Sequence, residues 1–91
     1  MSIAVRFSPK SMDVAKYNEC IRRLEQAGAG TPPGRLYHVC YGSADQLGVV
    51  DVWESQATFD EFGKTLMPIL QELGIDPGEP EISEVHSIIT A

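Results

Sequence analysis

The order in which two hydrophobic periodicities follow one another along the chain is the feature that most constrains its fold. Four short segments are rich in β-branched and aromatic residues, and two longer segments repeat apolar residues every three or four positions. The expected strands are residues 2–7, 36–41, 48–53 and 82–90, and the expected helices lie between Ser11 and Gly28 and between Ser55 and Gly74. This order predicts an α+β, ferredoxin-like β-α-β-β-α-β sandwich, in which a four-stranded antiparallel sheet carries two helices on one face.

The length and charge of the chain narrow the class of protein. Ninety-one residues are expected to form a single domain, 1–91. A net charge of −6 argues against a nucleic-acid partner, and no apolar run is long enough for a membrane span. The start of the chain lacks the basic region of a signal peptide, so a cytoplasmic protein is expected. Cys20 and Cys40 lack the spacing of a structural zinc site, so we expect two free thiols and no bound metal.

One residue breaks the pattern of the second helix. Pro68 lies among its apolar positions, and a proline inside a helix removes a backbone hydrogen bond. We therefore expect two helical pieces that are interrupted around Gly63–Met67. In the first helix the apolar stripe consists of Val14, Tyr17, Ile21 and Leu24.

Both faces of the predicted sheet are apolar, although only two helices are present to cover them. In the second strand, residues 36, 38 and 40 lie on one side of the sheet. Tyr37, Val39 and Tyr41 lie on the other side and are equally suited to burial. An apolar face of this size is rarely left in water, so we expect a homodimer packed sheet against sheet. The expected contacts are Tyr37, Val39, Tyr41, Val50 and Val52.

The chain also resembles a known superfamily. The resemblance lies in the β-α-β-β-α-β order, in Val52-Trp53-Glu54-Ser55 with the following Phe59 and Phe62, and in Val85-His86 of the last strand. These features are similar to the dimeric α+β barrel proteins of the antibiotic-biosynthesis-monooxygenase type, and within them to an uncharacterised branch. The resemblance implies a sheet-to-sheet dimer and a ligand held between sheet and helices, near a tryptophan that Trp53 matches. Members that degrade haem often carry a histidine on the second helix, but residues 59–66 contain none, so we expect no haem and no other cofactor.

The second and third strands suggest a catalytic pair. A hairpin that pairs Tyr41 with Gly48 through a loop of several residues would set His38 opposite Asp51 and Leu36 opposite Trp53. A carboxylate beside an imidazole can orient it as a general base, so His38 and Asp51 are the candidate catalytic residues. The alternative is a buried polar pair whose members only satisfy each other.

The remaining candidate residues would bind a ligand. The indole of Trp53 can stack on an aromatic molecule or belong to the core, and Arg6 either points into the pocket to pair an acidic ligand or lies at its rim. His86 is a candidate on the last strand, where it is otherwise structural or exposed. The full predicted set is Trp53, Tyr17, Phe59, Phe62, His86 and Arg6.

Three functions remain open from the sequence. The first is a small dimeric protein that binds a small apolar or aromatic ligand between sheet and helices. The second is a cofactor-independent monooxygenase or isomerase with a His38–Asp51 base. The third is a purely structural interaction module. The expected partners are a second copy of the chain and a small molecule.

Overall fold

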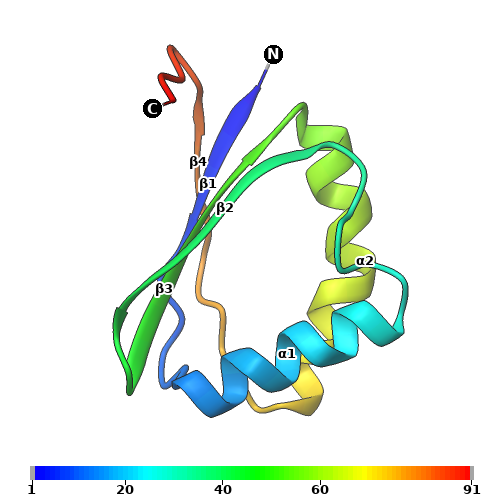
Figure 1. The fold of residues 1–91 in the computed structure, drawn as a ribbon, viewed down its shortest axis with the longest axis vertical. Coiled ribbons are helices and arrows are strands. Elements are labelled where there is room, and N and C mark those ends of the chain that lie inside the picture. Colours follow the sequence, from blue (N-terminus) through cyan, green and yellow to red (C-terminus); the bar gives the residue numbers. More distant parts are fainter. Residues whose placement is uncertain (1, 91) are drawn as a thin grey trace.

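Four strands and two helices follow one another in the predicted order (Figure 1). The computed structural model describes residues 2–90. Its elements are β1 (Ile3–Phe7), α1 (Val14–Gln26), β2 (Arg35–Ser43), β3 (Gln46–Trp53), α2 (Gln56–Glu72) and β4 (Glu81–Glu84). The strands form one antiparallel sheet in the order β2-β3-β1-β4, and both helices lie on the same side of it (Figure 1). The predicted ferredoxin-like α+β architecture is therefore confirmed.

The first helix begins two residues later than the sequence suggested. Ser11 was expected to cap it, but Ser11 has a positive φ of 61°, whereas a capping residue is extended. Asp13 is extended and accepts a hydrogen bond from the backbone N–H of Lys16 at 2.8 Å. The end of the helix is as predicted, because Gly28 has a φ of 78° and its N–H donates to the carbonyl of Glu25.

The second helix is not interrupted at its proline. Its predicted cap is confirmed, since the Ser55 hydroxyl accepts from the Thr58 N–H at 3.2 Å. The helix then continues through Pro68 without a break, so the predicted interruption around Gly63–Met67 is wrong. Pro68 and Lys64 are both exposed. The Lys64 carbonyl that loses its N–H donor therefore lies on the solvent side, where water can replace the missing bond.

The hairpin of β2 and β3 has the predicted register but a shorter loop. Tyr41 pairs with Gly48 and His38 with Asp51, as expected. The strands continue to Ser43 and Gln46, so the loop contains only residues 44 and 45 and the predicted longer loop is wrong. Two backbone hydrogen bonds hold this end of the hairpin at the start of α1, from the N–H of Leu47 to the carbonyl of Met12 and from the N–H of Val14 to the carbonyl of Ala44.

A β-bulge changes the other end of the hairpin. Leu36 was expected opposite Trp53, but Arg35 takes that place, and the register shifts between Arg35 and Tyr37. A bulge adds one residue to a strand and leaves it unpaired. Here the extra residue is Leu36, which is half exposed, while Arg35 is turned toward the helices.

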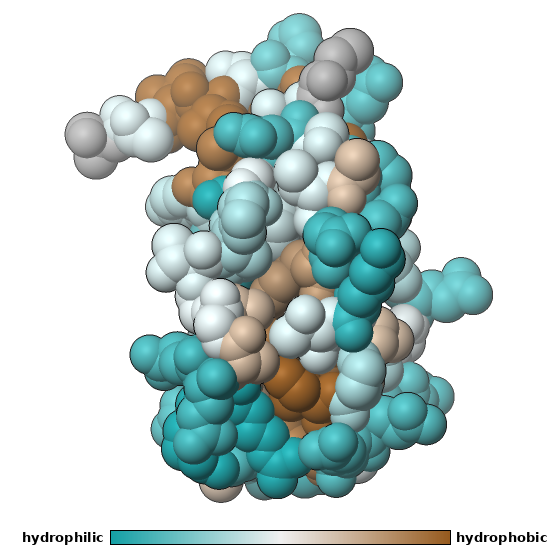
Figure 2. Space-filling model, turned by 90° about the vertical axis from the view of Figure 1, so that its right-hand side faces the viewer, coloured by the Kyte–Doolittle hydropathy of each residue, from teal (hydrophilic) through white to brown (hydrophobic). Residues whose placement is uncertain are grey.

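The last strand is much shorter than predicted. Only Glu81–Glu84 pair with β1, because the antiparallel β4 reaches the first residue of that strand, Ile3, at Glu84. The final backbone bond of the pair runs from the Val85 N–H to the Ser2 carbonyl. Among the described residues 2–90, no strand pairs with residues 85–90. Ile88 and Ile89 remain exposed there, and apolar atoms project beside one end of the chain (Figure 2).

The two helices cover only one face of the sheet, as predicted (Figure 1). The side chains of Val5 and Trp53 point toward the helices and are fully buried. Together with residues of both helices they form the core, which contains Ile3, Val5, Phe7, Met12, Cys20, Leu24, Leu47, Trp53, Phe62, Leu70 and Ile75. On the opposite face Tyr37, Val39 and Tyr41 are 55%, 38% and 38% exposed, and no helix lies over them (Figure 1).

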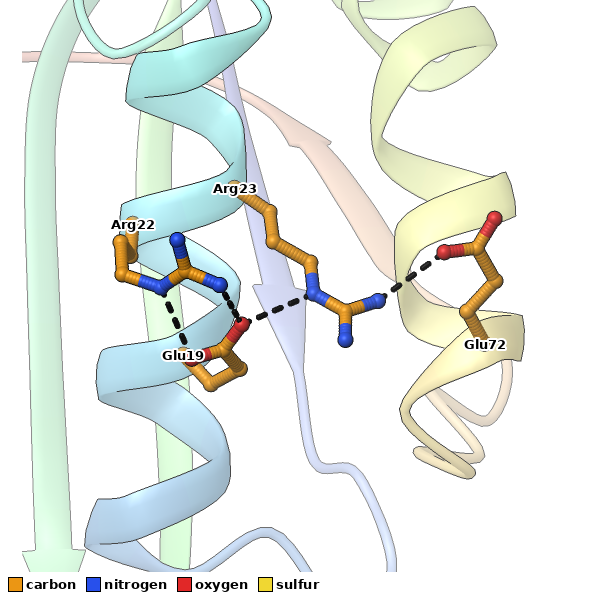
Figure 3. A network of polar contacts seen from close by, with 4 residues as sticks. All are labelled: Glu19, Arg22, Arg23 and Glu72. Carbon is orange, nitrogen blue, oxygen red and sulfur yellow. Dashed lines mark hydrogen bonds and ion pairs between the residues drawn. The ribbon is translucent and has the colours of Figure 1, made fainter.

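A network of charged side chains joins the two helices on their solvent side (Figure 3). Glu19 binds both Arg22 and Arg23, three and four residues further along α1, and these hydrogen bonds lower the pKa of Glu19 to about 2. Arg23 also donates from Nη1 to Glu72 on α2 at 2.9 Å. Exposed ion pairs contribute little energy, so this network mainly orients α1 against α2. Neither helix within residues 2–90 is long and apolar enough to cross a bilayer.

Replacing Pro68 by alanine should stabilise the protein. The change restores an N–H donor to the Lys64 carbonyl at an exposed helix position and should raise the free energy of unfolding by about 1–3 kcal/mol. Urea unfolding followed by circular dichroism measures it. Gln71→Ala, at an exposed position of the same helix, serves as the control and should change little. A Pro68→Ala protein that is less stable than the wild type would contradict this account of the helix.

Candidate functional site

A cavity lies between the helices and the helix-facing side of the sheet. Its volume is about 70 Å³, which is room for several water molecules, and it is partly open to solvent. On the side where the helices lie, apolar atoms are visible in a hollow framed by hydrophilic side chains (Figure 2). Most residues that line the cavity are apolar, among them Phe7, Met12, Ile21, Leu24, Phe62, Leu66, Leu70 and Ile75, and the polar ones are Tyr17, Arg35, His38 and Asp51.

Three of the polar side chains form one chain of hydrogen bonds. Asp51 of β3 is 4% exposed, and its Oδ1 lies 2.5 Å from Nδ1 of His38 on β2. The other ring nitrogen of His38, Nε2, lies 2.7 Å from the hydroxyl of Tyr17 on α1. The rings of Tyr17 and His38 are nearly parallel, with 5° between their planes and 6.1 Å between their centres. The structure thus brings together the two predicted catalytic residues and one predicted ligand-binding residue.

The direction of these hydrogen bonds follows from the chemistry of the groups. A carboxylate only accepts, so Nδ1 of His38 carries the proton that it donates to Asp51. In the neutral ring Nε2 is then an acceptor, and the Tyr17 hydroxyl donates to it. Both ring nitrogens of His38 are therefore occupied. The sequence suggested that His38 itself takes a proton from a ligand, but in this arrangement its Nε2 is already bound to the hydroxyl of Tyr17, which lines the cavity beside it.

The electrostatic surroundings keep Tyr17 protonated. Burial raises the pKa of its hydroxyl above the ordinary value of 10.0, the nearby Cys40 and Asp51 act in the same direction, and the charge of Arg35 opposes them. Burial likewise raises the pKa of the Cys40 thiol. At neutral pH the hydroxyl of Tyr17 is therefore a hydrogen-bond donor to His38, and its oxygen retains capacity to accept a second hydrogen bond.

The predicted aromatic residues divide into two groups. Phe62 lines the cavity together with Tyr17. Trp53 and Phe59 are not among its lining residues. Trp53 is fully buried, with ring centres 5.1 Å from Phe62 and 5.8 Å from Phe59, and its Nε1 finds no hydrogen-bond partner within residues 2–90. The indole is a core residue behind the wall of the cavity, and no ligand can stack on it without a rearrangement of Phe62 or Phe59.

Two predicted residues lie elsewhere, and one residue of the cavity was missed. Arg6 points to the open face of the sheet, where its Nε donates to the Tyr41 hydroxyl at 3.3 Å. His86 follows β4 and is exposed. Arg35 lines the cavity instead, because the bulge at Leu36 turns it toward the helices. A bulge of this kind has no distinct signal in a single sequence, so strand alternation does not predict it.

The site contains no cluster of metal ligands within the described part of the chain. No three histidine, cysteine, aspartate or glutamate side chains gather there. Cys20 is buried and Cys40 is half-buried, and both are free thiols, as the sequence predicted.

The element order, the antiparallel sheet and the one-sided helices define the class of fold: the chain has the ferredoxin-like α+β fold of the antibiotic biosynthesis monooxygenases. It is similar to a candidate antibiotic biosynthesis monooxygenase from Chloroflexus aurantiacus J-10-fl, with a TM-score of 0.68 and 14% identity over 99% of this chain and 98% of that one. It is also similar to SnoaB, a cofactor-independent oxygenase from Streptomyces nogalater, with a TM-score of 0.64 and 14% identity over 99% and 96% of the two chains.

The same fold also occurs in proteins that are not described as oxygenases. A conserved protein from Methanosarcina mazei Go1 matches with a TM-score of 0.60 and 15% identity over 91% of this chain and 89% of that one. No protein-family model matches the sequence, and no curated protein matches it either. At these identities the similarity establishes the fold, and the chemistry has to be argued from the site.

The buried hydroxyl of Tyr17 should titrate late. Alkaline absorbance titrations are recorded for the wild-type protein and for Tyr17→Phe, and the second curve is subtracted from the first. The midpoint of the difference should lie above pH 10.0, because burial disfavours the phenolate of Tyr17. Absorbance of tyrosinate measures the titration, and circular dichroism shows over which range the fold persists. A difference curve with its midpoint at or below 10.0 would show that Tyr17 is not held in this environment.

Proposed function

We propose that the cavity, together with the open space at its mouth, binds a small, mostly apolar ligand that carries a phenolic or enolic hydroxyl group. The observation that supports this proposal best is the Tyr17–His38–Asp51 chain of hydrogen bonds, which begins at a buried carboxylate and ends at an apolar cavity. Pockets for small molecules typically combine apolar walls with a few convergent polar groups. In this proposal the ligand hydroxyl donates to the oxygen of Tyr17, and the ring of Phe62 contacts the apolar part of the ligand.

The same chain of hydrogen bonds can move a proton. The ligand hydroxyl would transfer its proton to the Tyr17 oxygen while the proton of Tyr17 passes to Nε2 of His38. The product is an ionised ligand and an imidazolium that Asp51 stabilises by its charge. His38 and Asp51 then act as the base, as the sequence suggested, and Tyr17 transmits the proton. This relay avoids leaving a charge on Tyr17, which its burial disfavours.

A second candidate function follows from this proton transfer. An ionised phenol or enol is electron-rich, and this makes it able to react with dioxygen or to isomerise. The chain shares its fold with SnoaB, which is described as a cofactor-independent oxygenase. The second proposal is therefore a cofactor-independent monooxygenase or isomerase that acts on a hydroxylated aromatic molecule. Uptake of dioxygen with such a molecule, lost in His38→Ala, would favour this function over binding alone.

The relay can be tested with 4-nitrophenol, whose ionised form absorbs in the visible range. When it is bound to the wild-type protein, its pKa should fall below its value in buffer, because the protein accepts the phenolic proton. Asp51→Asn keeps the shape of the side chain but removes the charge, so it should raise the pKa of the bound probe by about one unit or more, which is a tenfold change in ionisation. Spectrophotometric titration of the bound probe measures both effects.

Glu54→Gln is the matched control, because Glu54 is an exposed acid that does not line the cavity. This variant should leave the pKa of the bound probe at the wild-type value. The proposed relay would be wrong if the bound probe had the same pKa in the wild-type and Asp51→Asn proteins. The binding proposal itself would be wrong if saturable binding of the probe were absent from the wild-type protein.

We further propose that the chain acts as one domain in a homodimer formed through the open face of the sheet. The five predicted contact residues lie on that face, and Tyr37, Val39 and Tyr41 remain substantially exposed there in the single chain. The face is continuous across β1, β2 and β3, and no helix of this chain covers it (Figure 1). A second copy that packs the same face against it would remove these side chains from water.

A charge at the centre of this face should disrupt the dimer. In light scattering at micromolar concentration, the wild-type protein should have twice the 10.0 kDa mass of one chain. Val50→Lys should give the monomer mass or an unfolded chain, because it places an unpaired charge in a dry interface. Gln26→Lys, at an exposed position of α1, should remain dimeric. A dimeric mass for Val50→Lys, or a monomeric mass for the wild type, would contradict the proposal.

A further inference from the structure

Arg35 is a half-buried cation at the wall of the cavity with most of its donors unused. Its Nη2 donates to the Gly30 carbonyl at 3.2 Å, and its guanidinium carbon lies 5.9 Å from the centre of the Phe62 ring. A guanidinium has five N–H donors in a planar fork that fits a carboxylate. The bond to Gly30 is the only side-chain hydrogen bond of Arg35 within residues 2–90, so the remaining donors are available to a ligand.

No acidic side chain within the described residues neutralises Arg35. Arg22, Arg23 and Lys64 each pair with a glutamate, although they lie on the outside of the helices. Arg35 forms no ion pair, and the carboxylate that shares the cavity, Asp51, is bound to His38. The chain has thirteen acidic residues against seven basic ones, so the lack of a partner does not reflect a shortage of acids. A partly buried charge without a counter-charge is costly, and an anionic ligand would remove that cost.

Arg35 and Tyr17 line the same cavity. Burial raises the pKa of the Tyr17 hydroxyl, and the positive charge of Arg35 lowers it, so the guanidinium is close enough for its field to reach that oxygen. Arg35 pairs with Trp53 and His38 pairs with Asp51, which is a step of two residues along β3. Two residues of a strand span about 7 Å, and both side chains point toward the helices. Arg35 and the Tyr17–His38 pair therefore meet the cavity at separate points of its wall, so one ligand can contact them with two different ends.

We propose that Arg35 binds a carboxylate at one end of the ligand while the ligand hydroxyl lies on Tyr17 at the other. This inference rests on the proposed function and gives it a substrate class, the hydroxylated aromatic carboxylic acids. The apolar middle of such a molecule would lie against Phe62 and Leu66, and Arg35 would set its orientation. Arg35 is then a specificity residue: it distinguishes an acid from the neutral molecule of the same shape.

Isothermal titration calorimetry with 4-hydroxybenzoate and its methyl ester tests this inference. The two probes share the ring and the phenolic hydroxyl, and only the acid carries a charge opposite Arg35. The wild-type protein should bind the acid about tenfold or more tightly than the ester, as a charge-assisted bidentate contact would provide. Arg35→Gln should lose this preference and keep its affinity for the ester within about twofold. Arg22→Gln, on the solvent side of α1 and away from the cavity, is the matched control and should retain the preference.

The outcomes separate this inference from the proposed function. Equal binding of acid and ester by the wild type would overturn the role of Arg35 and leave the binding of phenols intact. Binding of neither probe would overturn the proposed function, and the inference with it. Equal weakening of both probes by Arg35→Gln would show that Arg35 only supports the loop at Gly30. If Arg35→Gln does not fold, Arg35→Lys keeps the charge without the planar fork and should show a smaller preference for the acid.

Discussion

The contact between Asp51 and His38 is the interaction on which the rest of the structure depends. Asp51 is a carboxylate in the centre of the sheet with almost no access to water, and such a group is tolerated only when it is paired. Its partner lies directly opposite on β2. A shift of the register by one residue would place Asp51 opposite a side chain of the other face and leave both polar groups buried without partners. The pair therefore favours one register, and that register decides which residues face the helices.

This register gives the sheet two different sides, one that faces the helices and one that is left open. The helix-facing side receives Trp53, Val5 and the side chains of α1 and α2, and it retains a cavity where these do not fill the space. The charged network of Glu19, Arg23 and Glu72 joins the two helices on their solvent side (Figure 3). The other side of the sheet has no helices left to cover it. A chain of this length buries only a modest core, so packing against a second copy would add to the apolar surface that it buries.

The polar groups of the cavity are few, and each has a distinct task in the proposed function. Asp51 sets the tautomer of His38, His38 stores a proton, and Tyr17 presents an oxygen toward the ligand. Arg35 adds a positive charge at a separate point of the wall. Binding and catalysis would use the same contacts in this arrangement. They differ in whether the proton of the ligand only forms a hydrogen bond with Tyr17 or moves on to His38.

The sequence by itself determined the element order, the two-faced sheet, the helix ends at Gly28 and Ser55, and the pairing of His38 with Asp51. These features follow from local rules, since side-chain alternation, capping residues and hairpin register all act over a few positions. The sequence could not supply features that depend on where other segments end or what surrounds a residue. The continuity of α2 at Pro68 depends on solvent beside one helix face, and the length of β4 depends on where β1 stops.

The candidate site also combines features that the sequence predicts with features that only tertiary packing decides. Trp53 is a core residue because Phe59 and Phe62 pack against it, and the bond between Tyr17 and His38 forms because α1 crosses over β2. Neither contact has a pattern along the chain, because each joins segments that are distant in sequence. Arg35 entered the cavity through a bulge that strand alternation does not encode. The sequence thus selected the fold and the His38–Asp51 pair, and tertiary packing decided which neighbours that pair has, since packing alone sets the distances between elements.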